Sequence, residues 1–487
     1  MSAFADTLLY IDGALRPAEN GRTYENIAPT TGRAVGRAAD GGAADMDAAI
    51  AAARRAFDAS DWAHDLPARI GWMDKLQAAL ADAVPAWRER IAAETGATMG
   101  VIESVGLAVP IEMMKWTIDL ARRYEFERDI GVTATMGVPS RRLVVKEAAG
   151  VVGAITPWNM PMQINLAKLT AALAAGCTVV LKPAPDTPWA AMMIGETAAR
   201  IGLPAGVLNI VTSAEKVALG EQLVADPRVD VISFTGSTAV GKRIMAAAAP
   251  TLKRVFLELG GKSANVVLDD ARFPDALYGA LAVCFHAGQG CSLPTRILLP
   301  RARYDEAVEI IRQMYESLPF GDPSSHEQFL GPVASKAQFE RVSGYIRLGQ
   351  EEGARLVTGG AVEAGEGYYI RPTLFADATN AMRIAQEEIF GPVLVAIPHD
   401  GDDDAVRIAN ESVYGLGGAV QSADPERALA VARRIRTGSI NVNSANMFGA
   451  DAPFGGYKQS GIGREMGVEG FEEYLETKTI AVEAQGA

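Results

Sequence analysis

The chain has 487 residues, of which 49% are hydrophobic and 22% are charged, an ordinary balance for a globular protein. This length exceeds what one hydrophobic core usually supports, so we expect two or three domains. The formal net charge is -13 at pH 7. It argues against nucleic acid and against an anionic membrane surface as partners, because both need a basic patch.

Cysteine and histidine are scarce in this sequence. The 3 cysteines do not suit a disulfide framework and indicate a reduced compartment. Residues 1–10 have no basic start and no long apolar run, so no signal peptide is predicted and the cytoplasm is the expected location. Neither an HExxH nor a CxxC spacing occurs, so we expect no metal site.

The first part of the chain has a helical pattern, from Ala44 to Arg128. Apolar residues recur at helical spacing in three segments, which are Met46–Phe57, Ile70–Val84 and Met113–Phe126. Pro67 and Pro85 are expected near helix starts. From Thr133 to Lys146 the sequence predicts an extended segment around a turn at residues 137–139.

An alternation of short apolar strands and helices follows. The predicted strands are Val151–Ile155, Thr178–Lys182, Val207–Val211, Val231–Phe234 and Val255–Glu258, and the predicted helices are Met162–Ala175, Pro188–Arg200 and Thr238–Ala248. After Gly261 we expect strands at Asn265–Leu268, Arg296–Leu299, Arg355–Thr358 and Val393–Ile397, with helices at Pro274–Phe285, Tyr304–Ser317 and Lys336–Glu352. This alternation indicates parallel sheets buried on both faces, which bind ligands at the carboxyl ends of their strands.

One of the cysteines is a candidate nucleophile. Cys291 lies in a Gly-Gln-Gly-Cys-Ser stretch, where small neighbours leave backbone N–H groups accessible to a substrate. The alternative is an inert buried thiol, the commoner fate of a free cysteine. Cys284 falls in an apolar helical pattern, and Cys177 lies between a helix-ending glycine and a strand, so both are expected to be structural. His286 is expected to be a helix-terminal histidine rather than the partner of Cys291, because such partners usually come from distant segments.

Three further features lie at the carboxyl ends of predicted strands. Glu258 ends an apolar strand ahead of a glycine pair, where its carboxylate would reach the ligand crevice, and a salt-bridged strand end is the alternative. Gly236 and Ser237 follow a strand and open a helix, which suits a pyrophosphate, although they form no GxGxxG fingerprint. Lys182 either hydrogen-bonds a ribose or is a solvated strand end.

Seven short motifs occur in a defined order along the chain. They are residues 157–161 (PWNMP), 182–185 (KPAP), 234–237 (FTGS), 257–262 (LELGGK), 288–291 (GQGC), 387–393 (EEIFGPV) and 453–461 (PFGGYKQSG). Together they resemble the aldehyde dehydrogenase superfamily over essentially the full chain. The resemblance implies an α/β fold with two Rossmann-like parallel-sheet domains, one for the cofactor and one for catalysis, plus a β-strand oligomerisation arm.

The resemblance assigns roles to the matching residues. Cys291 would attack an aldehyde carbon, Asn159 and the Cys291 N–H would stabilise the oxyanion, and Glu258 would activate the water that releases the acid. The implied cofactor contacts are Trp158, Lys182, Gly236, Ser237, Glu388 and Phe390, and Glu465 is a candidate proton relay. Because the acylating branch of the superfamily characteristically lacks the Glu258 carboxylate, hydrolysis to a free acid is expected.

The cofactor preference is affected by a departure from the family pattern. Pro185 stands where many members carry a glutamate that binds the ribose 2′-hydroxyl and repels a 2′-phosphate. We still expect NAD, since Asp186 is adjacent and no arginine follows, but the missing carboxylate leaves NADP open.

The substrate channel departs from the pattern as well. His286 replaces the usual asparagine, where it either tunes the pKa of the thiol or lines the channel. Met160 and Ala167 stand where aromatic residues are common, and together with Phe285 and His286 they are predicted to line a wide apolar channel. Aromatic, terpenoid or longer aliphatic aldehydes are therefore the expected substrates.

The resemblance also implies the domain organisation. Residues 1–124 and 148–257 would form the NAD(P)-binding domain, residues 258–457 the catalytic domain, and residues 125–147 and 471–487 the arm. A projecting strand has unpaired N–H and C=O groups, so the arm should pair with another subunit and a homodimer or homotetramer is expected.

The expected function is oxidation of an aldehyde to a carboxylic acid with NAD(P)⁺, through a thiohemiacetal and a thioester on Cys291. Two alternatives stay open from the sequence. One is a thiol esterase or hydrolase without redox chemistry, and the other is a non-enzymatic protein that retains the fold.

Overall fold

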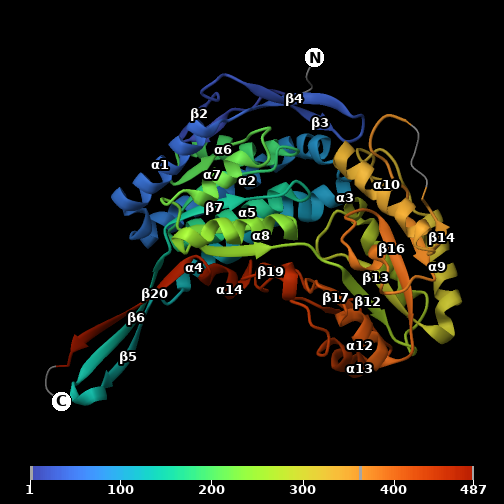
Figure 1. Ribbon diagram of the computed structural model, residues 1–487. Helices are drawn as coiled ribbons and strands as arrows, with labels where there is room; N and C mark the ends of the chain where they lie inside the picture. Colours follow the sequence, from blue (N-terminus) through green and yellow to red (C-terminus); the bar gives the residue numbers. More distant parts are fainter. Residues whose placement is uncertain (1–3, 361–364, 485–487) are drawn as a thin grey trace.

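The computed structural model describes residues 4–360 and 365–484. It has two α/β lobes and a narrow arm that projects away from the first of them (Figure 1). Three short segments lie outside the described residues. They are residues 1–3 of the predicted cofactor domain, residues 361–364 of the predicted catalytic domain and residues 485–487 of the predicted arm.

The first lobe is built on an eight-stranded sheet. Its strands from β11 to β9 are parallel, and β19, β1 and β2 join the two edges antiparallel. In spatial order the strands are β19 (Gly461–Ile462), β11 (Arg254–Glu258), β10 (Val231–Thr235), β7 (Val151–Ile155), β8 (Thr178–Lys182), β9 (Leu208–Ile210), β1 (Leu9–Ile11) and β2 (Ala14–Arg16). Thr235 pairs with Glu258 in the register of β10 and β11, so both residues lie at the carboxyl edge of the sheet.

Helices cover both faces of this sheet, and each face has its own apolar core. One core includes α2 (Leu66–Thr95), α4 (Ala108–Arg123), α5 (Pro161–Ala175) and α6 (Pro188–Ile201), and the other includes α1 (Ala43–Ala59), α7 (Ala218–Ala225) and α8 (Thr238–Ala248). Both α5 and α6 begin with a proline, which lacks the N–H that a first turn leaves unbonded. Each ends at a glycine with left-handed backbone, Gly176 and Gly202.

The second lobe contains a seven-stranded sheet. Its order is β14 (Arg355–Thr358), β15 (Thr373–Ala376), β16 (Val393–His399), β13 (Pro294–Pro300), β12 (Ser263–Val267), β17 (Gly418–Gln421) and β18 (Asn441–Val442). Only the β14–β15 pair is antiparallel among these described strands. The helices of this lobe are α9 (Tyr304–Glu316), α10 (Lys336–Glu351), α11 (Arg383–Gln386), α12 (Asp402–Asn410) and α13 (Pro425–Ala432).

The arm is a three-stranded antiparallel sheet in which β6 (Ser140–Ala148) lies between β5 (Glu127–Thr133) and β20 (Leu475–Glu483). A two-stranded sheet of β3 (Thr23–Ala28) and β4 (Arg33–Ala39) lies on the first lobe. Short helices complete the fold, namely α3 (Met99–Val101), the π-helical turn Ile102–Gly106, α14 (Gly467–Glu472) and 3₁₀ turns at Asp61–Ala63, Thr135–Gly137, Ala249–Thr251, Asp275–Gly288, Arg301–Arg303 and Lys458–Ser460.

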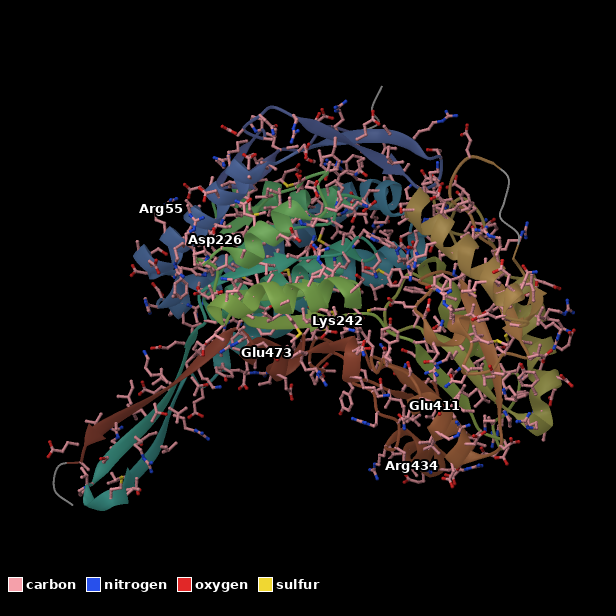
Figure 2. All side chains as sticks on the ribbon, in the orientation of Figure 1. Arg55, Asp226, Lys242, Glu411, Arg434 and Glu473 are labelled. Atoms are coloured by element: carbon pink, nitrogen blue, oxygen red, sulfur yellow. The ribbon has the colours of Figure 1, made fainter. Side chains whose placement is uncertain are left out.

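Side chains fill the space between the sheets and their helices, whereas charged groups such as Arg55, Lys242 and Arg434 are exposed at the surface (Figure 2). Among the described residues, no helix is long and apolar enough to cross a membrane.

The predicted α/β class and the strand–helix alternation are confirmed, but several details of the sequence prediction are wrong. The extended segment predicted from Thr133 begins earlier, with β5 at Glu127. Pro85 does not lie near a helix start. It lies inside α2, on an exposed turn where water can bond the carbonyl that loses its intrahelical donor. The segment predicted as a helix at Pro274–Phe285 forms 3₁₀ turns over Asp275–Gly288. The strands β1 to β4 were not predicted, because they are short and several of their positions are exposed.

Substitution of two glycines in the loop between α6 and β9 tests how tightly α1 packs on the first sheet. A Cβ at Gly206 (φ +80) would lie 2.4 Å from the Ala52 carbonyl oxygen of α1, whereas a Cβ at Gly202 (φ +72) would meet nothing within 4 Å. We expect Gly206→Ala to lower the free energy of unfolding by about 3 kcal/mol, against about 1 kcal/mol for Gly202→Ala. Urea unfolding of both variants measures the difference, and equal losses would contradict the close contact with α1.

Candidate active site

A cavity of about 280 Å³ lies where the carboxyl ends of β10 and β11 face the second lobe. Eight residues predicted from the sequence line it, which are Trp158, Asn159, Gly236, Ser237, Glu258, Cys291, Glu388 and Phe390. They come from segments spread over more than two hundred positions of the chain. The fold therefore brings the candidate nucleophile, the candidate base and most candidate cofactor contacts to one place.

Cys291 follows the 3₁₀ turns that end at Gly288, and it is half-buried. Burial raises the pKa of its thiol to about 12, and the carboxylates of Glu388, Glu258 and Glu465 add to this increase by disfavouring the thiolate. This pKa favours the neutral thiol near pH 7. Cys177 and Cys284 are fully buried, as expected of structural thiols.

Glu258 is the last residue of β11, and it is buried with Oε2 free of any hydrogen-bond partner. Burial raises the pKa of its carboxyl well above the ordinary value, with a further increase from Glu465 and an opposing effect of Lys168. No ion pair involves Glu258 among the described residues, so the alternative of a salt-bridged strand end is wrong. Lys168 instead pairs with Glu465, the predicted relay residue, which lies just outside the cavity lining.

The amide of Asn159 is held in place by the segment that precedes Cys291. Asn159 Nδ2 donates to the Gln289 carbonyl oxygen at 2.8 Å, which leaves its second N–H free for another acceptor. Gln289 is itself fixed, because its Oε1 accepts a hydrogen bond of 2.8 Å from the Ala334 N–H. The oxyanion donor predicted from the sequence therefore has a defined orientation before any substrate is bound.

His286 contributes to this arrangement through the backbone. Burial lowers the pKa of its imidazole to about 4, so the ring is neutral near pH 7. Its Nε2 lies 2.7 Å from the Asn159 carbonyl oxygen and donates to it. His286 lines neither this cavity nor the second one described below. It positions Asn159, a role different from the two expected from the sequence, which were tuning the pKa of the thiol and lining the channel.

Other residues prepare the part of the cavity expected to hold a cofactor. Ser237 caps α8 by accepting a hydrogen bond from the Val240 N–H at 3.4 Å. Glu388 Oε1 accepts from the Gly261 N–H at 3.1 Å, and burial raises the pKa of this carboxyl to about 7. The rings of Trp158 and Phe390 meet edge to face with centroids 5.4 Å apart. Lys182 is buried at the end of β8, and it does not line the cavity.

Three residues of the cavity lining are not predicted from the sequence, namely Ile164 of α5 and Gln338 and Arg341 of α10. Gln338 and Arg341 of α10 line the cavity and donate to backbone carbonyls of the 388–390 segment. The only local signal is Ser335, whose hydroxyl accepts from the Gln338 N–H and marks the start of α10. That signal predicts a helix start and carries no information about a site.

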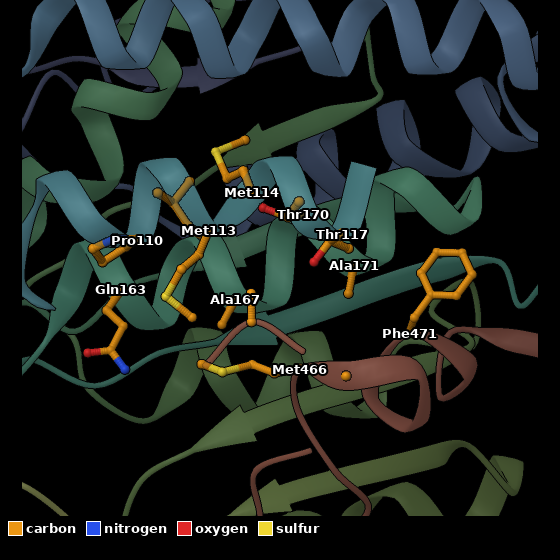
Figure 3. A pocket seen from close by; sticks show the side chains of 13 residues that line it. Pro110, Met113, Met114, Thr117, Gln163, Ala167, Thr170, Ala171, Met466 and Phe471 are labelled. Carbon is orange, nitrogen blue, oxygen red and sulfur yellow. The ribbon is translucent and has the colours of Figure 1, made fainter. Parts of the chain in front are cut away.

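A second, smaller cavity of about 30 Å³ lies between α4, α5 and the 466–471 segment (Figure 3). Its lining is mostly apolar and includes Met113, Met114, Ala167, Met466 and Phe471. Of the four residues predicted to form a substrate channel, Ala167 alone lines this cavity. Met160 is buried at the start of α5, and Phe285 packs at the edge of the first core.

The raised pKa of Cys291 predicts how its thiol reacts without any substrate. The alkylation rate with iodoacetamide should rise about tenfold per pH unit between roughly pH 7 and pH 10, since the thiolate reacts and a pKa near 12 keeps it scarce. Mass spectrometry of the modified chain follows the rate. Cys291→Ser serves as the control and should stay unmodified, because Cys177 and Cys284 are buried. A plateau near pH 8 would show that the pKa is not raised.

Comparisons with known proteins agree with this geometry. The model of the aldehyde dehydrogenase family matches residues 16–480. A 3-succinoylsemialdehyde-pyridine dehydrogenase of a Pseudomonas species is 40% identical, over 97% of this chain and 97% of its own length.

Solved structures give the same result. An aldehyde dehydrogenase of Mycobacterium tuberculosis in complex with NAD⁺ is 40% identical, with a TM-score of 0.94 over 100% of both chains. A cysteine-to-alanine mutant of aldehyde dehydrogenase C from Pseudomonas syringae, in complex with NAD⁺ and octanal, is 40% identical, with a TM-score of 0.93 over 99% of this chain and 98% of that one. The chain thus belongs to the aldehyde dehydrogenase family.

Proposed function

We propose that the protein oxidises an aldehyde to a free carboxylic acid with NAD⁺, using Cys291 as nucleophile and Glu258 as general base. One observation carries the proposal, namely that Cys291, Asn159 and Glu258 line the same cavity. A thiol alone suits many reactions. A thiol beside an amide donor and a buried, unpaired carboxylate suits acyl chemistry that ends in hydrolysis.

The chemistry divides into an oxidation and a hydrolysis. The Cys291 thiol loses its proton to solvent and adds to the aldehyde carbon as the thiolate, and the free N–H of Asn159 and the Cys291 backbone N–H donate to the resulting oxyanion. A bound NAD⁺ would accept the hydride from that carbon, and Cys291 would then carry a thioester. Glu258 then removes a proton from water as the water adds to the thioester carbon. The C–S bond then breaks, which releases the acid and leaves Cys291 as the thiolate.

Several residues fit a dinucleotide. Gly236 and Ser237 line the cavity at the start of α8, where unbonded N–H groups suit a pyrophosphate. Glu388 also lines it with a buried carboxylate able to accept from a ribose hydroxyl. Acidic groups near Lys182 favour NAD⁺ over NADP⁺, because their negative charge repels a 2′-phosphate. The charge of Glu215 opposes the lowering of the Lys182 pKa, and Asp186 Oδ2 forms an ion pair with Lys216 Nζ at 3.2 Å. Relatives of this chain have been solved with NAD⁺.

The preferred substrate is a hydrophobic aldehyde. The second cavity, next to the first turns of α5, is small but has a mostly apolar lining, which favours contact with an apolar part of a substrate over a charged one. Two relatives support this preference, since one was solved with octanal and the other is named for a pyridine semialdehyde.

The arm makes the protein a homodimer or a homotetramer. β5 and β20 are the edges of its sheet, and each presents unpaired backbone groups. Apolar side chains on the arm are exposed, among them Val132 at 58%, Val138 at 60% and Met136 at 96%. Such a surface suits a second copy of the chain.

Substitutions at Cys291 and Glu258 test the mechanism. Cys291→Ala should abolish NADH formation, which the absorbance of NADH measures. Glu258→Gln should keep a rapid burst of about one NADH per site and slow steady turnover at least about a hundredfold, because thioester hydrolysis loses its base. Glu469→Gln, an exposed glutamate on α14, is the control. Acid release from an ester, with no NADH formed from any aldehyde, would instead favour a thiol hydrolase, and unchanged turnover of Cys291→Ala would reject the proposal.

A substitution in the second cavity tests the substrate class. Ala167→Trp would fill this cavity, so kcat/KM for octanal or benzaldehyde should fall at least about tenfold while that for acetaldehyde changes little. Ala86→Trp, on the exposed side of α2, is the control. A substrate panel in which the wild type prefers acetaldehyde or a charged semialdehyde would contradict the proposed preference.

A further inference from the structure

Helix α10 holds a neighbouring segment of the second lobe through its backbone carbonyls. Gln338 Nε2 donates to the carbonyl oxygens of Phe390 and, at 3.4 Å, of Ile389. Arg341, one turn further along the helix, donates from Nε to the Ile389 carbonyl oxygen at 3.3 Å and from Nη2 to that of Glu388. Three consecutive carbonyl groups thus accept hydrogen bonds from two side chains of α10.

The same face of α10 also binds the residue that precedes these three. Tyr345 lies one turn beyond Arg341, and its hydroxyl donates to Glu387 Oε2 at 2.7 Å. The Arg341 guanidinium lies over the Tyr345 ring, 5.1 Å from its centroid. Side chains at positions i, i+3 and i+7 share one face of a helix. α10 therefore contacts residues 387–390 one after another.

Close backbone packing at Gly391 continues these contacts. A Cβ at Gly391 would lie 2.4 Å from Val342 Cγ2 of α10. A Cβ at Gly288 would lie 2.1 Å from the Gly391 carbonyl oxygen, and Gly288 is three residues before Cys291. The segment thus touches both α10 and the loop that carries the proposed nucleophile.

Phe390 has a backbone conformation that depends on its surroundings. Its φ is +65°, in the left-handed region, where a bulky residue is kept only by the contacts around it. In this conformation the ring meets Trp158 edge to face and lines the active-site cavity. The Ile389 and Phe390 carbonyls belong to the peptide groups on either side of Phe390, so the two bonds from Gln338 restrain rotation about its φ and ψ.

Arg341 acts on Glu388 in two ways. Its bond to the Glu388 carbonyl fixes the backbone there. Burial raises the pKa of the Glu388 carboxyl to about 7, while the Gly261 N–H and the charge of Arg341 oppose this increase. The guanidinium therefore also favours the ionised carboxylate, which accepts a hydrogen bond more strongly than the neutral acid does.

We propose that Gln338 and Arg341 are positioning residues for NAD⁺ binding, which hold Glu388 and Phe390 in the conformation that receives the cofactor. They act through the backbone of the segment and not as ligands. The amide nitrogen of Gln338 has two N–H groups and two backbone acceptors, so the segment occupies its donors. This inference rests on the proposed function, in which Glu388 and Phe390 contact the cofactor.

NAD⁺ binding and hydrogen exchange together test the proposal. Gln338→Met keeps the length of the side chain and removes both donors, so the Kd for NAD⁺, measured by calorimetry, should rise about tenfold. Without NAD⁺, amide hydrogen exchange of residues 387–393 should become at least about fivefold faster, because the segment loses its restraints. Gln350→Met, at an exposed glutamine of the same helix, is the matched control and should change neither quantity.

Variants at Arg341 keep the test decisive if Gln338→Met does not fold, because the Arg341 side chain is exposed. Arg341→Met should raise the Kd for NAD⁺ about tenfold. Arg341→Lys keeps the charge but replaces the planar fork with a single ammonium, so it should restore most of the affinity and leave a rise of about threefold. Arg347→Met, at another exposed arginine of α10, is the control. The KM for NAD⁺ should follow the Kd, while the KM for the aldehyde changes less than about twofold.

Two results would overturn this inference alone. One is an unchanged Kd for NAD⁺ in both Gln338→Met and Arg341→Met. The other is weaker binding with unchanged exchange of residues 387–393, which would make the two side chains direct ligands of the cofactor. A wild-type chain that binds no NAD⁺ would instead reject the proposed function, and this inference with it.

Discussion

The active site of this protein depends on the passage of the chain from β11 to β12 through Gly260 and Gly261. A Cβ at Gly261 would lie 2.4 Å from the Cys291 carbonyl oxygen, and one at Gly260 would lie 2.4 Å from a carboxylate oxygen of Glu388. Only residues without side chains let the two lobes approach this closely. This contact brings the end of the first sheet, with Glu258, against the segment that carries the thiol. Backbone packing thus limits the separation between Glu258 and Cys291, the proposed base and the proposed nucleophile.

Burial is the second consequence of this approach. The pKa values of Glu258, Glu388 and Cys291 are all raised, with loss of solvent as the largest cause. Loss of solvent therefore shifts each of these groups toward its neutral form. The hydrogen bond from the Gly261 N–H to Glu388 partly offsets that cost on the cofactor side.

Much of the fold follows from local sequence signals. The apolar runs of β7, β8 and β10 alternate with helices that start at proline and stop at glycine, and each such element was predictable within a few residues. Where a short-range signal is weak, prediction fails. Strand β2 has only three residues, and these are little buried. Pro85 should end a helix by its local preference, but long-range packing of α2 keeps this exposed turn helical.

The sequence by itself determined which chemical groups are available to this protein. They are an amide, a helix start suited to phosphate, a carboxylate and a thiol, and their motifs follow one another in the order found in one family. Their motifs are local, because each depends on a few neighbouring residues in a fixed backbone conformation. Only the tertiary structure decided that His286 bonds the Asn159 carbonyl and that Gln338 and Arg341 join the cavity. These facts arise from contacts between segments far apart in the chain, for which local sequence carries no signal.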